Sequence, residues 1–183
     1  MSTFPGFPAP AAAMDQPLEV LAACHERIER QCATLERLAA HLATAGADEA
    51  ARTAAAGVIR YFTTAALDHH ADEETDLFPA LLEAVACSDA ICLRALLDGL
   101  VAEHIALAAH WRQLAPFLEK VGAGEAPNVD QLAATVAAFA AAYRTHIVRE
   151  NQELLPMAAR LLGDDDTARL SQAMTARRRT TPL

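Results

Sequence analysis

The sequence predicts an all-α protein: an antiparallel up-down-up-down four-helix bundle with a short fifth C-terminal helix. Ala and Leu dominate its 183 residues and aromatic residues make up only 5%, a composition that favours helix over strand. Apolar residues recur at alternating spacings of three and four in four long segments, as on the buried face of a helix. Short turns join these segments, so neighbouring helices are expected to pack antiparallel.

The first two helices are predicted from their buried faces and their ends. The first covers residues 18–45, with Asp15 and Pro17 as start signals and Gly46 as the stop. Its core-facing positions are Leu21, His25, Ile28, Cys32, Leu35, Ala39 and Leu42. The second opens at Asp48, runs to about Ala86 and is bent by Pro79. Its core-facing positions are Val58, Phe62, Ala65, His69, Glu73, Leu77 and Ala80.

The third and fourth helices begin at the N-cap residues Ser88 and Asn128. The third buries Leu93, Leu97, Leu100, His104, Leu107, Trp111, Leu114, Leu118 and Val121. The fourth buries Leu132, Val136, Phe139, Tyr143, His146, Glu150, Leu154, Met157 and Leu161. Gly163 ends it, and the fifth helix is expected from Asp164 to about Ala176.

The domain organisation follows from these boundaries. Residues 1–15 are expected to be a disordered leader, residues 16–163 the bundle, and residues 164–183 a short helix with a basic tail. The tail run Arg177 to Arg179 is expected to be a solvated helix end. A net charge of −9 argues against nucleic-acid binding, and no apolar stretch approaches the ~20 residues needed to cross a bilayer.

The four cysteines form neither a CxxC pair nor a regular framework. Buried thiols in a reducing compartment are the simplest interpretation, which predicts a cytoplasmic protein.

Six polar residues occupy core-facing positions that ordinary bundles fill with apolar side chains. They are His25, His69, Glu73, His104, His146 and Glu150. In an antiparallel hairpin, residues equidistant from the turn lie at the same height. The midpoints between successive histidines are residue 47, residues 86 to 87, and residue 125, and each falls in a predicted turn. All four histidines are therefore expected in one layer, within about one helical turn, ~5 Å.

The two glutamates are expected to enter the same layer. Each follows a histidine by four residues, one turn along the same helix face, and His-x3-Glu-x3-Leu-Phe-Pro at residue 69 is matched by His-x3-Glu-x3-Leu-Leu-Pro at residue 146. Burying two carboxylates without cations is costly, and neither Lys nor Arg lies on these faces. The pattern thus predicts a dinuclear metal site. Nitrogen and oxygen donors without thiolate favour two irons, with manganese or zinc as alternatives.

At these residues the sequence resembles the hemerythrin-like, or HHE cation-binding, domain family, over about residues 18–162. The resemblance lies in a lone His on each odd helix and His-x3-Glu on each even one. It implies a non-haem di-iron centre in a four-helix bundle, with His25, His69, His104 and His146 as terminal ligands and Glu73 and Glu150 bridging. Oxygen-carrying hemerythrins have a fifth histidine, in His-x3-His on the third helix, and an Asp bridge on the fourth. Here residue 108 is Ala, so the resemblance is closer to HHE proteins linked with iron, oxygen or nitric oxide response.

Other polar residues near the predicted layer have simpler interpretations. Tyr143 lies one turn before His146 and can reach a ligand or the metal, but core packing is favoured. His70, His41 and His110 are placed beside the buried faces, as flank or surface residues. Asp72, Glu74 and Asp76 are assigned to a solvated acidic face, with contact between Glu74 and a metal ligand as an alternative.

Three functions remain compatible with this pattern. The first is a binding or sensing protein whose centre takes up dioxygen, nitric oxide or iron. The second is a di-iron oxidase or peroxidase, and the third is a metal-free interaction bundle. An additional acid or base is missing from the buried faces, which favours a binding or sensing protein over an enzyme. The sequence does not identify a protein partner.

Overall fold

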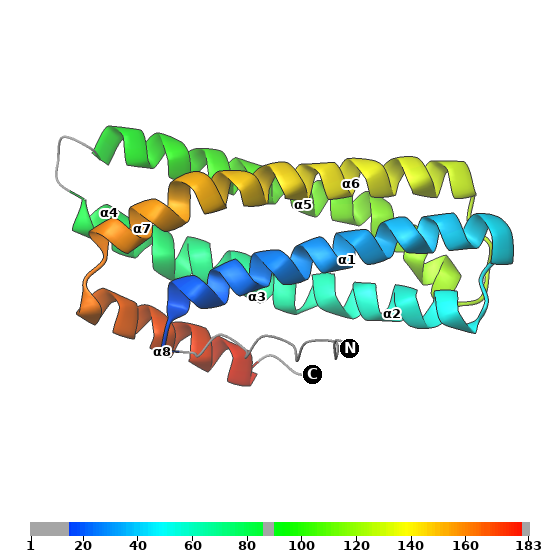
Figure 1. Ribbon diagram of the computed structural model, residues 1–183, viewed down its shortest axis with the longest axis horizontal. Helices are drawn as coiled ribbons and strands as arrows, with labels where there is room; N and C mark the ends of the chain where they lie inside the picture. The colour runs from blue at the N-terminus through cyan, green and yellow to red at the C-terminus, as the bar shows by residue number, and fades with distance from the viewer. Residues whose placement is uncertain (1–14, 86–89, 181–183) are drawn as a thin grey trace, which may run out of the picture.

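The computed structural model describes residues 15–85 and 90–180, and all regular structure within these residues is helical. Four helical segments, called arms here, lie along the long axis of the molecule, and each runs in the opposite direction to the one before it (Figure 1). The predicted fold class is therefore confirmed. The first arm is α1 (Pro17–Ala45) and the third is α5 (Ala90–Gly122). The second arm comprises α2 (Glu49–Thr63), α3 (Ala65–Ala71), the π-helix η1 (Asp72–Leu77) and α4 (Phe78–Ala84). The fourth comprises α6 (Val129–Arg149), the π-helix η2 (Glu150–Leu154) and α7 (Leu155–Leu161), and α8 (Asp164–Thr180) follows it.

Local sequence sets most of the helix ends. Pro17 occupies the first turn of α1, where a missing N–H costs nothing. The Asp48 side chain accepts a hydrogen bond from the Ala51 N–H and caps α2, and Asn128 does the same for α6 through Gln131. Gly46 and Gly124 take positive φ values of 69° and 80° in the two turns, a conformation that favours glycine. The predicted leader up to residue 14 and the predicted cap Ser88 lie outside the described residues.

The second arm is not the single helix that the sequence predicted. The hydroxyl groups of Thr63 and Thr64 donate to backbone carbonyls of the preceding turn, a pattern that bends helices, and the helix breaks at Thr64. Next to the break, one buried position differs from the prediction, while His69 and Glu73 are buried as predicted. Ala66 is buried at 1% exposure, whereas the predicted Ala65 is exposed.

Two π-helices change which residues of the second and fourth arms face the core. Pro79 and Pro156 each follow one of them, η1 and η2. Proline lacks an N–H and its ring clashes with the carbonyl four residues back, and a wider π turn relieves this conflict. Beyond each π-helix the buried residue is Leu81 or Ala158, one position after the predicted Ala80 and Met157.

The core consists of two apolar clusters, one toward each end of the bundle. α1 packs against α2 and α6, and α5 packs against the same two helices, so α1 and α5 lie diagonally across the bundle. The turn-end cluster includes Ile28, Leu35, Phe62, Leu114 and Phe139. The α8-end cluster includes Leu21, Leu77, Leu100, Leu154 and Met174. On α1 the boundary falls between Cys24 and Ile28, and on α5 between Leu100 and Leu107.

Helix α8 is longer and more tightly attached than the sequence predicted. It runs to Thr180 and buries Leu170 and Met174 in the α8-end cluster. In Figure 1 it lies beside the start of α1, and it also contacts η1. The C-terminal helix therefore packs on the segment that carries Glu73.

Candidate metal centre

The six predicted polar residues meet in the layer between the two apolar clusters. His25 comes from α1, His69 from α3, Glu73 from η1, His104 from α5, His146 from α6 and Glu150 from η2. Each is at most 4% exposed. They form two groups whose ligand atoms lie within 4.8 Å of one another: His25, His69, Glu73 and Glu150, and His104, His146, Glu73 and Glu150. Both glutamates belong to both groups.

The π-helices explain how both glutamates face inward. In each copy of the repeat the buried residues are spaced by four: His69, Glu73, Leu77 and Leu81 in the first, and His146, Glu150, Leu154 and Ala158 in the second. In a regular α-helix a step of four overshoots one turn by ~40°, so the third step would leave the buried face. The wider turns of η1 and η2 keep all four residues of each copy directed inward.

Each carboxylate directs one oxygen toward each pair of histidines. Glu73 Oε1 lies 3.6 Å from His69 Nε2 and 3.9 Å from His25 Nε2, while its Oε2 lies 3.4 Å from His104 Nε2. Glu150 also directs one oxygen to each pair: its Oε2 lies 3.1 Å from His25 Nε2, and its Oε1 lies 3.2 Å from His146 Nε2. Two carboxylates that each face two imidazole pairs have the arrangement needed to bridge two cations.

Three histidines are oriented by acceptors at the Nδ1 side of the ring. His25 Nδ1 lies 2.7 Å from the Asn151 side-chain oxygen, and His104 Nδ1 lies 2.6 Å from Glu74. His146 Nδ1 lies 2.8 Å from Glu103, which also accepts from Arg149. A ring that donates from Nδ1 keeps the Nε2 lone pair available for a metal. The contact foreseen for Glu74 is present, but Asn151 and Glu103 were not predicted, because both lie off the buried faces in the sequence pattern.

The innermost atoms of the cluster have no hydrogen-bond partner. They include His25 Nε2, His69 Nε2 and all four carboxylate oxygens of Glu73 and Glu150. His104 Nε2 and His146 Nε2 lie 3.1 Å apart, and a hydrogen bond between them would require one ring to carry a second proton. Unpartnered buried polar atoms are costly. Cations placed among these nitrogens and oxygens would satisfy them, so the residues fit a metal centre.

The pKa values in the cluster show that the two buried carboxylates lack a fixed positive charge beside them. Burial opposes protonation of His25 and His104, yet the contacts with Glu150 and Glu73 outweigh it and raise the pKa of each ring to about 10. His69 is fully enclosed, and burial holds its pKa well below the usual value. Burial also raises the pKa of Glu73. Without metal, the carboxylates draw protons onto the neighbouring imidazoles.

His70 was predicted beside the buried face, but the structure turns its ring toward the cluster. The ring stacks on His104, with 4.0 Å between centroids and 15° between planes, and its Nε2 atom is buried without a partner. His70, His104 and His146 form a third group with ligand atoms within 4.8 Å of one another. His70 keeps the partly exposed flank position predicted for it, but the direction of its ring toward the cluster was not predicted.

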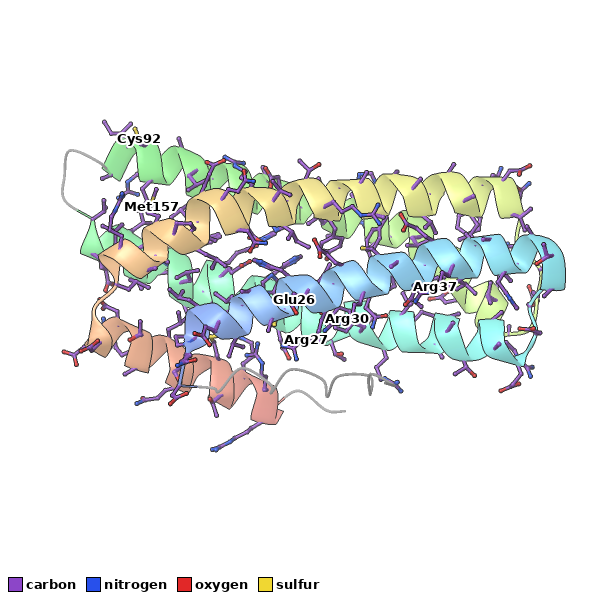
Figure 2. All side chains as sticks on the ribbon, viewed as in Figure 1. Glu26, Arg27, Arg30, Arg37, Cys92 and Met157 are labelled. Atoms are coloured by element: carbon purple, nitrogen blue, oxygen red, sulfur yellow. The ribbon has the colours of Figure 1, made fainter. Side chains whose placement is uncertain are left out.

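The other residues weighed from the sequence divide between core and surface. Tyr143 packs against Phe62 and Phe139 in the turn-end cluster, as expected for a core residue. His41 is 38% exposed and lies 3.0 Å from Asp48, and His110 is partly exposed. Figure 2 shows Glu26, Arg27, Arg30 and Arg37 along α1, where all four side chains are exposed.

The acidic face and the basic tail were both predicted to be solvated, and this was wrong for Asp72, Arg177 and Arg178. Asp72 is 0% exposed and pairs with Arg177 and Arg178 of α8. Arg177 also binds Asp76 at 2.7 Å. Only tertiary packing brings residues this far apart in the chain together, so no local pattern in the sequence indicated the pair.

Of the described cysteines, Cys24 and Cys32 are buried and Cys92 is exposed at the start of α5 (Figure 2), so the expectation of buried thiols fails at Cys92. None of them joins the metal-ligand groups found among the described residues. A cavity of about 590 Å³ lies between α1 and the second arm, lined by Arg27, Tyr61 and Arg178 among others, and none of the six polar residues lines it. The polar layer is thus enclosed rather than part of this surface pocket.

Within residues 15–85 and 90–180, helices with both the length and the apolar character of a membrane span are not found. A protein of Haemophilus influenzae described as uncharacterized is 29% identical over 171 residues, which cover 93% of this chain and 95% of that protein. The Hemerythrin HHE cation binding domain matches residues 16–158, a range that contains all six polar residues of the layer. The chain therefore belongs to the hemerythrin HHE cation-binding domain family.

Proposed function

We propose that the protein binds two iron ions in the polar layer and uses them to bind or sense a small ligand such as dioxygen, nitric oxide or further iron. The observation that carries the proposal is the sharing of both glutamates between two histidine pairs. His25 and His69 would hold one ion, His104 and His146 the other, and Glu73 and Glu150 would bridge them.

Charge and donor chemistry support two cations of this kind. Two buried carboxylates stand among histidines that would be neutral as metal ligands, and the arginine nearest in sequence, Arg149, binds Glu103 instead. Two divalent ions would neutralise the carboxylates and coordinate the unpartnered atoms. The donors are imidazole nitrogen and carboxylate oxygen without thiolate, which suits iron or manganese, with zinc as a further possibility.

The chain's own residues would enclose the centre and orient its ligands. A di-iron centre, when bound, supplies electrons and a coordination position for dioxygen or nitric oxide. The two apolar clusters exclude water from both sides of the layer. Asn151, Glu74 and Glu103 keep three rings directed inward from their outer nitrogens.

The cellular setting belongs to the same proposal. The described cysteines are free thiols, which is consistent with the reducing environment of the cytoplasm. The net charge of −9 argues against nucleic acid as a partner.

Iron analysis of the purified protein tests the assignment directly. Protein loaded anaerobically with iron(II) should contain about two irons per chain, and its optical spectrum should change on exposure to air or nitric oxide. His69→Ala and Glu150→Ala should each lose most of the bound iron, whereas His41→Ala, which changes a partly exposed histidine outside the layer, should retain it. Equal iron content in all four proteins, or none in any, would reject the proposed ligands.

The same preparation separates a sensor or carrier from an enzyme. A sensor or carrier should show a reversible spectral change at a fixed amount of ligand. Sustained consumption of peroxide or of a reductant would instead identify an oxidase or peroxidase.

A further inference from the structure

Among the described residues next to the polar layer, His70 has a ring position that the proposed centre does not explain. It follows His69 in α3 and is only partly buried as a residue, but its Nε2 atom is closed off from solvent. A buried ring nitrogen without a partner is unfavourable. A phenylalanine would fill the same space against His104 without that cost.

The ring of His70 lies against two of the proposed ligands, and its buried Nε2 atom has no hydrogen-bond partner. Its ring lies 4.0 Å from that of His104 and 6.1 Å from that of His146, measured between centroids. One ring nitrogen from each of the three residues falls within a common 4.8 Å. Metal–nitrogen bonds of about 2.0–2.1 Å place two nitrogens of one ion at most about 4.2 Å apart, so the His70 ring must turn slightly out of its stack on His104 to share the ion of His104 and His146.

We propose that His70 is a fifth histidine ligand, binding the same cation as His104 and His146. The inference rests on the proposed function, because it assigns an additional donor to one of the two proposed ions. The two ions then have unequal protein ligands: three histidines on the His104 side and two on the His25 side, with both glutamates shared.

His70→Phe separates coordination from packing, because phenylalanine keeps an aromatic ring against His104 but supplies no nitrogen. His110→Phe is the matched control, since His110 is a partly exposed histidine that belongs to none of the ligand groups found among the described residues. Zinc(II) serves as the probe because it is redox-inert and diamagnetic. Zinc titration gives the affinities, and nitrogen-15 NMR of the histidine rings counts the coordinated imidazoles.

The expected result is five coordinated rings in the unaltered protein and in His70→Phe only four. In the variant one of the two zinc ions should bind at least tenfold more weakly, the lower bound for losing even an outer partner of a ligand, while the other is unaffected. His110→Phe should match the unaltered protein. Melting curves of the three metal-free proteins establish that they fold equally well.

Two outcomes would overturn the inference, and they differ in what else they overturn. If the unaltered protein binds two zinc ions through four rings while that of His70 stays uncoordinated, His70 only packs against the centre and the proposed function stands. If neither zinc nor iron binds to the unaltered protein, the proposed function fails together with the fifth ligand.

Discussion

At the scale of single residues, the cluster depends on atoms that face away from its centre. The Nδ1 atoms of His25, His104 and His146 are each held by a side chain from a different part of the chain. These contacts fix the direction of the ring before any ion binds and favour the tautomer whose Nε2 can bind a metal. Such outer partners typically alter metal affinity 10- to 100-fold, so they are the residues where the orientation of the ligands can be tested.

Asn151→Ala removes the acceptor that lies 2.7 Å from His25 Nδ1. We expect metal affinity to fall by about tenfold to a hundredfold, because the His25 ring becomes free to turn or to change tautomer. Competition with a chelator of known affinity measures the change. Gln152→Ala, at the neighbouring exposed position, is the control, and identical affinities for the two variants would contradict the orienting role of Asn151.

At the scale of secondary-structure elements, the attachment of α8 to η1 is the least expected feature. Asp72 is buried directly before Glu73, and its carboxylate is neutralised by two arginines from α8. Burial raises the pKa of Asp72, and the two arginines oppose that rise. The C-terminal helix thereby stabilises the π turn that carries a bridging glutamate.

Arg177→Gln combined with Arg178→Gln should leave Asp72 buried without a cationic partner. We expect the free energy of unfolding to fall by about 3 kcal/mol, the lower end for breaking a buried ion pair, because both arginines are partly exposed to water. Urea unfolding measures this. Arg179→Gln changes an exposed arginine on the same helix and should leave the free energy of unfolding nearly unchanged. Equal stability of the double and single variants would contradict a stabilising role for the contact of Asp72 with the two arginines.

At the scale of the whole molecule, the polar layer joins all four arms between two separate apolar clusters. Each arm contributes at least one of the six residues, and the two glutamates contact histidines from the other arms. A bound metal pair would therefore cross-link the bundle at a layer where apolar packing is missing. Metal binding should be linked to global stability rather than to local order alone.

Removing the metal with a chelator should lower the melting temperature. An excess of ion at 100 to 1,000 times its dissociation constant stabilises the folded state by about 2.7 to 4.1 kcal/mol, which corresponds to roughly 10 °C for a chain of this size. Differential scanning calorimetry with and without chelator measures the shift. Glu150→Ala should melt at nearly the same temperature in both conditions, and a chelator effect of equal size in this variant would place the stabilising metal elsewhere.

The sequence by itself determined the four arms, the height of the polar layer and which six residues enter it. Helical periodicity and equal distances from the turns are local properties, so the spacing of His25, His69, His104 and His146 was enough to predict that they meet. Proline and asparagine at the helix starts were equally informative, because capping depends on neighbouring backbone groups.

Only the tertiary structure decided the features that depend on phase changes or on partners distant in the chain. The wider turns of η1 and η2 rotate the second and fourth arms away from a uniform 3.6-residue period, which is why Leu81 and Ala158 are buried in place of their predicted neighbours. The sidechain positions of His70, Asn151, Glu103 and Asp72 likewise follow from contacts with other arms or with α8. Periodicity specifies which face of a helix is buried, but the side chains that contact this face come from other parts of the chain.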